Sequence, residues 1–148
     1  MDKKITLSGV PETMLQTIYA RAKESKDRGA IHDKKAEEII GKLNYDFSLA
    51  DKDAPMHSGV IARTIVLDKL VSEYLAKNPR ATVVNIACGL DTRCYRMTGF
   101  KHWYNLDLPE TIAVREKLLP DMAISPRLPC PQWMTGAKWS RRVELMSL

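Results

Sequence analysis

Long apolar runs are missing from this chain, and so are the features that mark secreted or membrane proteins. No stretch approaches the ~18 apolar residues that a membrane-spanning helix needs. The first residues, Met-Asp-Lys-Lys-Ile, lack the apolar segment of a secretory signal. The 148 residues include only three cysteines, an odd number that cannot pair fully. We therefore expect free thiols, a cytoplasmic location and no membrane partner.

The chain also has little excess of one charge sign. Lysine and arginine total 23 and the acidic residues total 18, which gives a net charge of +5. Residues 122–148 contain four basic residues and one acid, a net of +3, which leaves +2 for residues 1–121. No basic run is interleaved with aromatic side chains, as a nucleic-acid interface would require. The histidines lack metal-ligand spacing. We expect neither nucleic acid nor a metal as a partner.

Helical periodicity is present in the first half of the chain. The apolar spacing predicts helices over residues 11–26, 34–43 and 59–76, with Asp33 as the N-cap of the second helix. Residues 44–58, rich in aspartate and interrupted by a proline, are predicted to be a loop. The third helix has an apolar stripe that we expect to lie in the core: Leu67, Leu70, Val71, Tyr74 and Leu75.

The apolar period changes in the second half. The β-branched run 81–87 predicts a strand buried on both faces of a parallel sheet, and residues 101–106 predict a second strand. Between them we expect a turn at 88–91 and a short helix over 92–97. Another helix is predicted over 109–119, because a proline opens it and a glutamate follows in its first turn.

This order of elements indicates an α/β fold, with N-terminal helices followed by the start of a doubly wound, Rossmann-like sheet. We divide the chain into a helical region (1–78), a first βαβα part (79–121) and a tail (122–148). The tail holds three of the eight prolines and two of the three tryptophans, without sustained periodicity. Two strands leave sheet edges unpaired, so we expect a truncated fold.

A candidate cofactor site lies where the two predicted strands end. Gly89 follows the first strand, in a turn that lets a ligand approach the backbone. Asp107 ends the second strand, 18 residues later, where an acid can accept hydrogen bonds from both ribose hydroxyls of a nucleotide. The turn has one glycine and does not match the full dinucleotide pattern. The alternative interpretation is a tight structural turn and an acid that caps the next helix.

Four blocks of the sequence, at 7–13, 59–64, 83–93 and 104–110, extend this pattern. The third ends in Gly-Leu-Asp-Thr-Arg, and the fourth reads Tyr-Asn-Leu-Asp-Leu-Pro-Glu. Together they resemble the leucine carboxyl methyltransferase-like family of class I enzymes, which includes bacterial polyketide-type O-methyltransferases. The resemblance covers about residues 5–121, which would be the N-terminal part of such an enzyme.

The resemblance implies S-adenosylmethionine as cofactor and methyl transfer to a carboxylate or hydroxyl oxygen of a small molecule or protein. It implies that a guanidinium pairs with the methionyl carboxylate of the cofactor. The backbone at 87–89 would form the floor under the cofactor, and an acid beside a leucine would bind the ribose. The implied cofactor-binding residues are Arg63, Ala87, Cys88, Gly89, Asp107 and Leu108. No catalytic residue is assigned, and Arg21 is a weaker candidate for the same carboxylate.

Two departures from the family keep other interpretations open. Ala87 stands where the family usually has glycine, which is tolerable only at negative φ. The unusual tail suggests a truncation or frameshift near residue 121, and thus a non-catalytic fragment that retains at most partial cofactor binding. A third interpretation is a module that binds a nicotinamide cofactor. The single glycine and the block around Arg63 argue against it.

Overall fold

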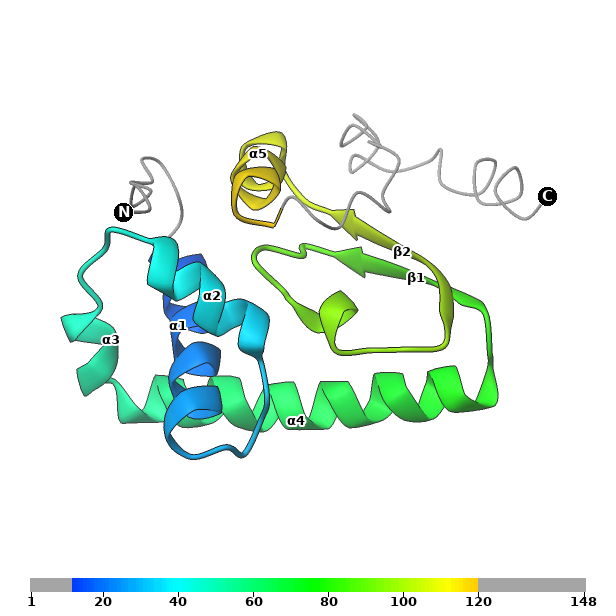
Figure 1. Ribbon diagram of the computed structural model, residues 1–148, viewed down its shortest axis with the longest axis horizontal. Helices are drawn as coiled ribbons and strands as arrows, with labels where there is room; N and C mark the ends of the chain where they lie inside the picture. Colours follow the sequence, from blue (N-terminus) through cyan, green and yellow to red (C-terminus); the bar gives the residue numbers. More distant parts are fainter. Residues whose placement is uncertain (1–11, 120–148) are drawn as a thin grey trace.

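The computed structural model of the protein describes residues 12–119. The predicted start of the first helix at Pro11, most of the block at 7–13 and the tail at 122–148 lie outside these residues. The elements in chain order are α1 (Glu12–Asp27), α2 (Lys34–Lys42), α3 (Ser48–Lys52), α4 (Ala54–Lys77), β1 (Ala81–Ile86), the 3-10 helix η1 (Arg93–Tyr95), β2 (Phe100–Leu106) and α5 (Pro109–Leu118). Figure 1 shows α1, α2 and α3 gathered at one end, with α4 running beneath both them and the strands.

Helices α1 and α2 pack through the apolar faces that the sequence predicts. Ile18 and Ile39 are fully enclosed in the larger core cluster of the protein. Asp33 is the N-cap of α2, because its side chain accepts a hydrogen bond from the Ala36 N–H at 3.0 Å. Both helices and the cap are therefore confirmed, within one residue at each described end.

The loop predicted over 44–58 is wrong. The structure forms α3 there, and α4 already begins at Ala54 instead of residue 59. Asp53 caps α4, since its side chain accepts the Met56 N–H at 2.9 Å. Pro55 lies in the first turn, where a missing backbone N–H breaks no hydrogen bond. Asp53 and Pro55, which indicated a loop, therefore begin α4, the longest described helix.

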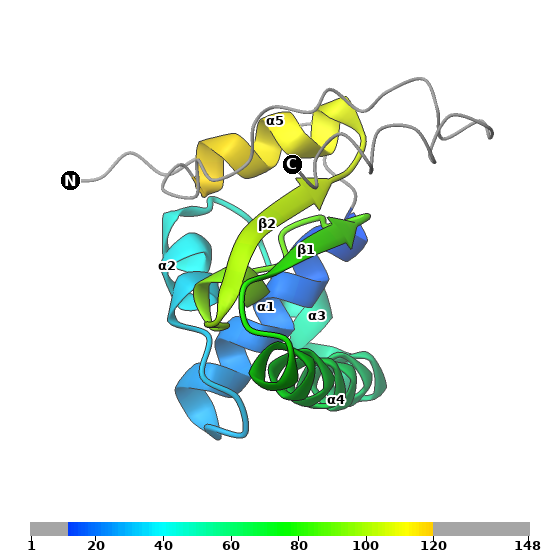
Figure 2. The ribbon, with the colours of Figure 1, turned by 90° about the vertical axis from the view of Figure 1, so that its right-hand side faces the viewer.

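Strands β1 and β2 are parallel neighbours, with Val83 opposite Trp103 and Asn85 opposite Asn105. They lie between α4 on one side and α5 on the other (Figure 2). Trp103 is buried in a second core cluster beneath the strands, together with Leu75 and Met97. The helix predicted over 92–97 is only the three-residue η1, so the connection between the strands is short.

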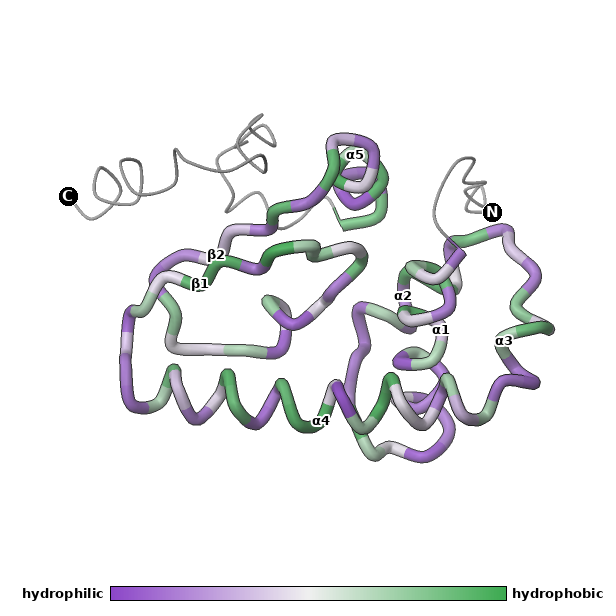
Figure 3. Tube along the Cα trace, turned by 180° about the vertical axis from the view of Figure 1, so that it is seen from behind, coloured by the Kyte–Doolittle hydropathy of each residue, from purple (hydrophilic) through white to green (hydrophobic). Residues whose placement is uncertain are grey.

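Two apolar surfaces that were expected to be buried are exposed. On β1, Val84 and Ile86 are 44% and 57% exposed, so only one face of this strand is covered. On α4, Leu75 is buried and Val71 packs partly buried against the second core cluster, as predicted, but the other predicted core residues of this helix are exposed. We call these residues, together with their exposed neighbour Val66, the exposed α4 stripe: Val66, Leu67, Leu70 and Tyr74. Figure 3 shows the apolar positions recurring along α4. Within residues 12–119 the sheet has two strands, and no further element covers these faces.

A buried ion network joins the helices to the connection between the strands. Asp33 is fully buried and accepts hydrogen bonds from Arg21 Nε at 3.1 Å, from Arg96 Nη1 at 2.9 Å and from the Thr92 hydroxyl. Arg96 also pairs with Asp68 of α4 at 2.8 Å. Burial lowers the pKa of Arg21, and the charge of Asp33 opposes that shift. Asp33 therefore holds elements together as well as capping α2.

Candidate functional site

A cavity of about 490 Å³ lies between the helices α1 and α4 and the carboxyl ends of β1 and β2. It is formed there because the carboxyl ends of neighbouring parallel strands meet at one edge of a sheet. The structure brings all six predicted cofactor-binding residues to its wall: Arg63, Ala87, Cys88, Gly89, Asp107 and Leu108. Arg21, the weaker candidate, lines it as well.

The glycine turn is tied to the end of β2 by hydrogen bonds. The Gly89 N–H donates to Asp107 Oδ2 at 2.7 Å, and the Cys88 N–H donates to the Leu106 carbonyl at 3.1 Å. Asp107 Oδ1 accepts the Leu108 N–H at 2.8 Å. Gly89 has φ +46°, a conformation in which glycine is favoured. A carboxylate can accept about four hydrogen bonds, so Asp107 retains capacity toward the cavity.

Cys88 is a buried part of the cavity floor. Burial raises the pKa of its thiol to about 11, although the charge of Arg115 opposes the shift. The thiol is therefore neutral near pH 7, and only a thiolate is a good nucleophile. Cys88 therefore acts as a small apolar side chain in the cavity floor.

Ala87 adopts the left-handed conformation, with φ +55°. The expected condition for an alanine here, a negative φ, is not met. A Cβ atom in this region costs about 1–2 kcal/mol, because it approaches the following carbonyl oxygen. The turn therefore stores strain beside the cavity.

Ala87→Gly is expected to raise the free energy of unfolding by about 1 kcal/mol, because it removes this Cβ. Urea denaturation measures the change. Ala113→Gly is the matched control on the exposed side of α5. It should lower the free energy of unfolding by about 1 kcal/mol, since glycine is a poor helix former. If both variants lose stability equally, Ala87 is not strained.

Arg63, Ala87 and Leu108 are the exposed members of the predicted set. Arg63 projects from α4, and no carboxylate among residues 12–119 forms an ion pair with it. By contrast, Arg21 is already bound to Asp33 and to the Leu90 carbonyl, the latter at 2.8 Å. Of these two guanidinium groups, Arg63 has the greater capacity for an added anion.

Sequence reasoning missed a polar cluster beside the turn. Asn85 donates to Asp91 at 3.1 Å, and Arg93 pairs with Asp91 at 2.6 Å and with Asp68 at 2.7 Å. Asn85, Asp91 and Arg93 all line the cavity. Asp91 and Arg93 belong to the Gly-Leu-Asp-Thr-Arg block, which was the signal that could have assigned them.

The histidines lie apart from this cavity. His57 lines a separate cavity of about 170 Å³, and its Nε2 atom lies 2.9 Å from Glu24 Oε2. His102 stacks on Tyr104 of β2, with ring centroids 6.0 Å apart. Among residues 12–119, no group of three or more potential ligands could hold a metal ion.

These features define a class of protein. Helices followed by a parallel strand, a glycine turn, and a second strand that ends in an acid form the start of a class I methyltransferase-type α/β fold. The sequence profile of the leucine carboxyl methyltransferase family matches residues 14–143. The chain belongs to this family, as the motif blocks predict. The match extends past residue 121 and includes most of the tail that the sequence analysis sets apart.

Curated relatives agree with this assignment. The chain is 38% identical over 127 residues to the tetracenomycin polyketide synthesis O-methyltransferase TcmP of Streptomyces glaucescens, covering 82% of this chain and 46% of the relative. It is 30% identical over 136 residues to an S-adenosyl-L-methionine-dependent methyltransferase of Gibberella zeae, covering 83% and 46%. A putative S-adenosyl-L-methionine-dependent methyltransferase of Mycobacterium marinum is 28% identical over 149 residues, covering 85% and 47%. The chain thus spans about half the length of these relatives.

Proposed function

We propose that the cavity binds S-adenosylmethionine, and that the chain forms the cofactor-binding part of an O-methyltransferase. The methyl acceptor would be a carboxylate or hydroxyl oxygen of a small molecule or protein. The observation that carries the proposal is the convergence of Arg63, the 87–89 turn and Asp107 on one cavity. The names of the relatives support the same cofactor.

The chemistry of the cavity fits each part of this cofactor. Asp107 has acceptor capacity for ribose hydroxyls after its two backbone hydrogen bonds are counted. Leu108, 57% exposed, offers an apolar surface for the adenine ring. Arg63 offers a planar guanidinium for the methionyl carboxylate. Ala87 and Gly89 are both in the left-handed conformation, and the turn that they form lines the same cavity.

The chain's contribution to methyl transfer would be positional. Bound S-adenosylmethionine supplies an activated sulfonium methyl group, so the protein needs to align an acceptor oxygen and exclude water. Arg63 would hold the methionyl carboxylate of the cofactor, and Asp107 would hold its ribose. Met14 and Thr17 of α1 also line the cavity and would contact a bound cofactor. A carboxylate acceptor would need no general base, whereas a hydroxyl acceptor would need one.

Titration of the purified chain with three ligands tests the proposal. Calorimetry should show saturable binding of S-adenosylmethionine and of its demethylated product S-adenosylhomocysteine, and no binding of NAD. All three ligands contain an adenosine, so a site that recognised adenosine alone would bind all of them. Comparable binding of NAD would identify a nicotinamide module instead and would contradict the proposal.

A second candidate is a chain that binds the cofactor without transferring a methyl group. The match covers 46% of the length of each of the first two relatives, and this candidate assigns cofactor binding alone to that part. In this case the titration gives the same saturable binding, but no methyl transfer follows when acceptors are added. The two candidates therefore differ only in turnover.

The remaining predictions concern the surroundings of the protein. No helix among residues 12–119 is both long and apolar enough to cross a membrane. The cytoplasmic location and the absence of a nucleic-acid partner stay predictions from the sequence.

A further inference from the structure

Arg115 of α5 is a buried cation next to the proposed cofactor cavity. It is 6% exposed and lies on the inward face of its helix with Thr111 and Leu118. Its Nη1 atom donates to the Gly89 carbonyl at 2.9 Å, and its Nη2 atom lies 3.8 Å from Cys94 Sγ. The sequence does not indicate this inward position, because two of the three buried residues of α5, Thr111 and Arg115, are polar.

The guanidinium of Arg115 has no carboxylate partner among residues 12–119. Burying a charge without a counter-ion is costly, and an apolar side chain of similar size would pack there at lower cost. An apolar side chain could not donate the hydrogen bond that Arg115 makes to the Gly89 carbonyl. Hydrogen bonds from charged donors are stronger than neutral ones.

Gly89 is therefore held at both of its polar backbone groups. Asp107 of the proposed ribose site accepts its N–H, and Arg115 donates to its carbonyl. Glycine has unusual backbone freedom because it lacks a Cβ, and these two contacts restrict Gly89 at φ +46°. We propose that Arg115 is a positioning residue for the cofactor: it fixes the turn at Gly89, and through this turn it fixes the Asp107 carboxylate. This inference rests on the proposed function.

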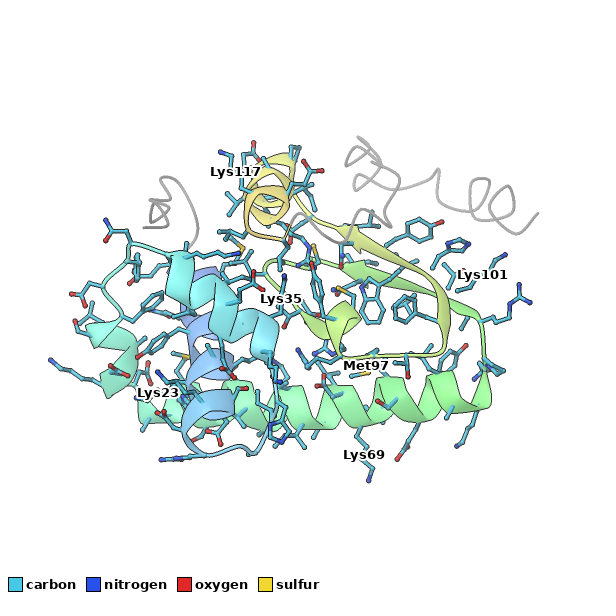
Figure 4. The ribbon with its side chains drawn as sticks, in the orientation of Figure 1. Lys23, Lys35, Lys69, Met97, Lys101 and Lys117 are labelled. Atoms are coloured by element: carbon cyan, nitrogen blue, oxygen red, sulfur yellow. The ribbon has the colours of Figure 1, made fainter. Side chains whose placement is uncertain are left out.

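The experiment compares Arg115→Met with Arg115→Lys. The lysine retains a charged donor that can reach one carbonyl, whereas methionine fills the space without a donor. Calorimetry with S-adenosylhomocysteine should show a dissociation constant raised about tenfold or more in Arg115→Met, and within about threefold of the original protein in Arg115→Lys. Lys117→Met is the control, because Lys117 lies on the outer side of the same helix (Figure 4). It should leave the affinity unchanged.

A second readout separates positioning from a merely structural role. Hydrogen exchange should show faster exchange of the Gly89 amide in Arg115→Met, while the amides in the middle of α4 stay as protected as before. If Arg115→Met does not fold, Arg115→Gln takes its place, since its side chain is too short to reach the carbonyl.

The proposal is overturned if Arg115→Met binds within twofold of the original protein, or if Arg115→Lys binds no better than Arg115→Met. Unchanged exchange at Gly89 would also overturn it. Failure of the proposed function is a different result: the unaltered chain would not bind S-adenosylhomocysteine at all. The hydrogen-exchange experiment needs no ligand. Even if the chain did not bind S-adenosylhomocysteine, it would test whether Arg115 restricts the backbone at Gly89.

Discussion

Asp33→Ala is expected to lower the free energy of unfolding by about 3–5 kcal/mol, because it removes the anion from a buried ion network. Arg21 and Arg96 both donate to Asp33, and the Asp33 side chain is completely buried. Without it, the one hydrogen-bond partner that Arg21 keeps among residues 12–119 is the Leu90 carbonyl. Urea denaturation followed by circular dichroism measures the change.

Asp53→Ala is the matched control for this prediction. Asp53 caps α4 as Asp33 caps α2, but it is exposed and has no ion pair among residues 12–119. The control should lose about 1 kcal/mol, which is typical of a helix cap. The difference between the two variants then measures the ion network alone. Equal losses would mean that Asp33 contributes only as a cap.

Asp107→Ala is expected to weaken binding of S-adenosylhomocysteine about a hundredfold or more, because two hydrogen bonds from ribose hydroxyls to a charged acceptor are lost. Calorimetry measures the dissociation constant. Glu110→Ala is the control, since Glu110 is an exposed acid of the first turn of α5 and does not line the cavity. It should change the affinity less than twofold.

A modified ligand shows whether the loss arises at the ribose, because Asp107 also holds the Gly89 turn. The original protein should bind a 2′,3′-dideoxy analogue of S-adenosylhomocysteine much more weakly than the parent compound. Asp107→Ala should bind both ligands equally, because the partner of the hydroxyls is gone. A variant that still distinguishes the two ligands would contradict the ribose assignment.

Local signals were sufficient to predict much of the fold. The Asp33 cap and the strands at 81–86 and 100–106 depend on neighbouring residues, and the sequence predicts them closely. The start of α4 was misplaced because aspartate and proline favour both loops and first helical turns. The stripe around Leu70 has the period of a buried face, but periodicity does not reveal whether another element covers it.

The part of the candidate site that depends on strand order could be predicted from the sequence. Gly89 and Asp107 meet because parallel strands bring their carboxyl ends together, and this follows from the order of elements. The ion pairs of Asp33 were not predictable, because they connect it to Arg96, 63 residues away. Arg115 was missed for a similar reason: only the packing of α5 shows that its charge points inward.

The exposed α4 stripe has a thermodynamic consequence for every measurement on this chain. Leu70 and Tyr74 remain 55% and 60% exposed, so burying them would still release hydrophobic free energy. A partner that binds this stripe on the folded helix, and not the unfolded chain, stabilises the fold by mass action. Where that partner is a second copy of the chain, the melting temperature rises with protein concentration. Comparisons between variants are meaningful only at matched protein concentration.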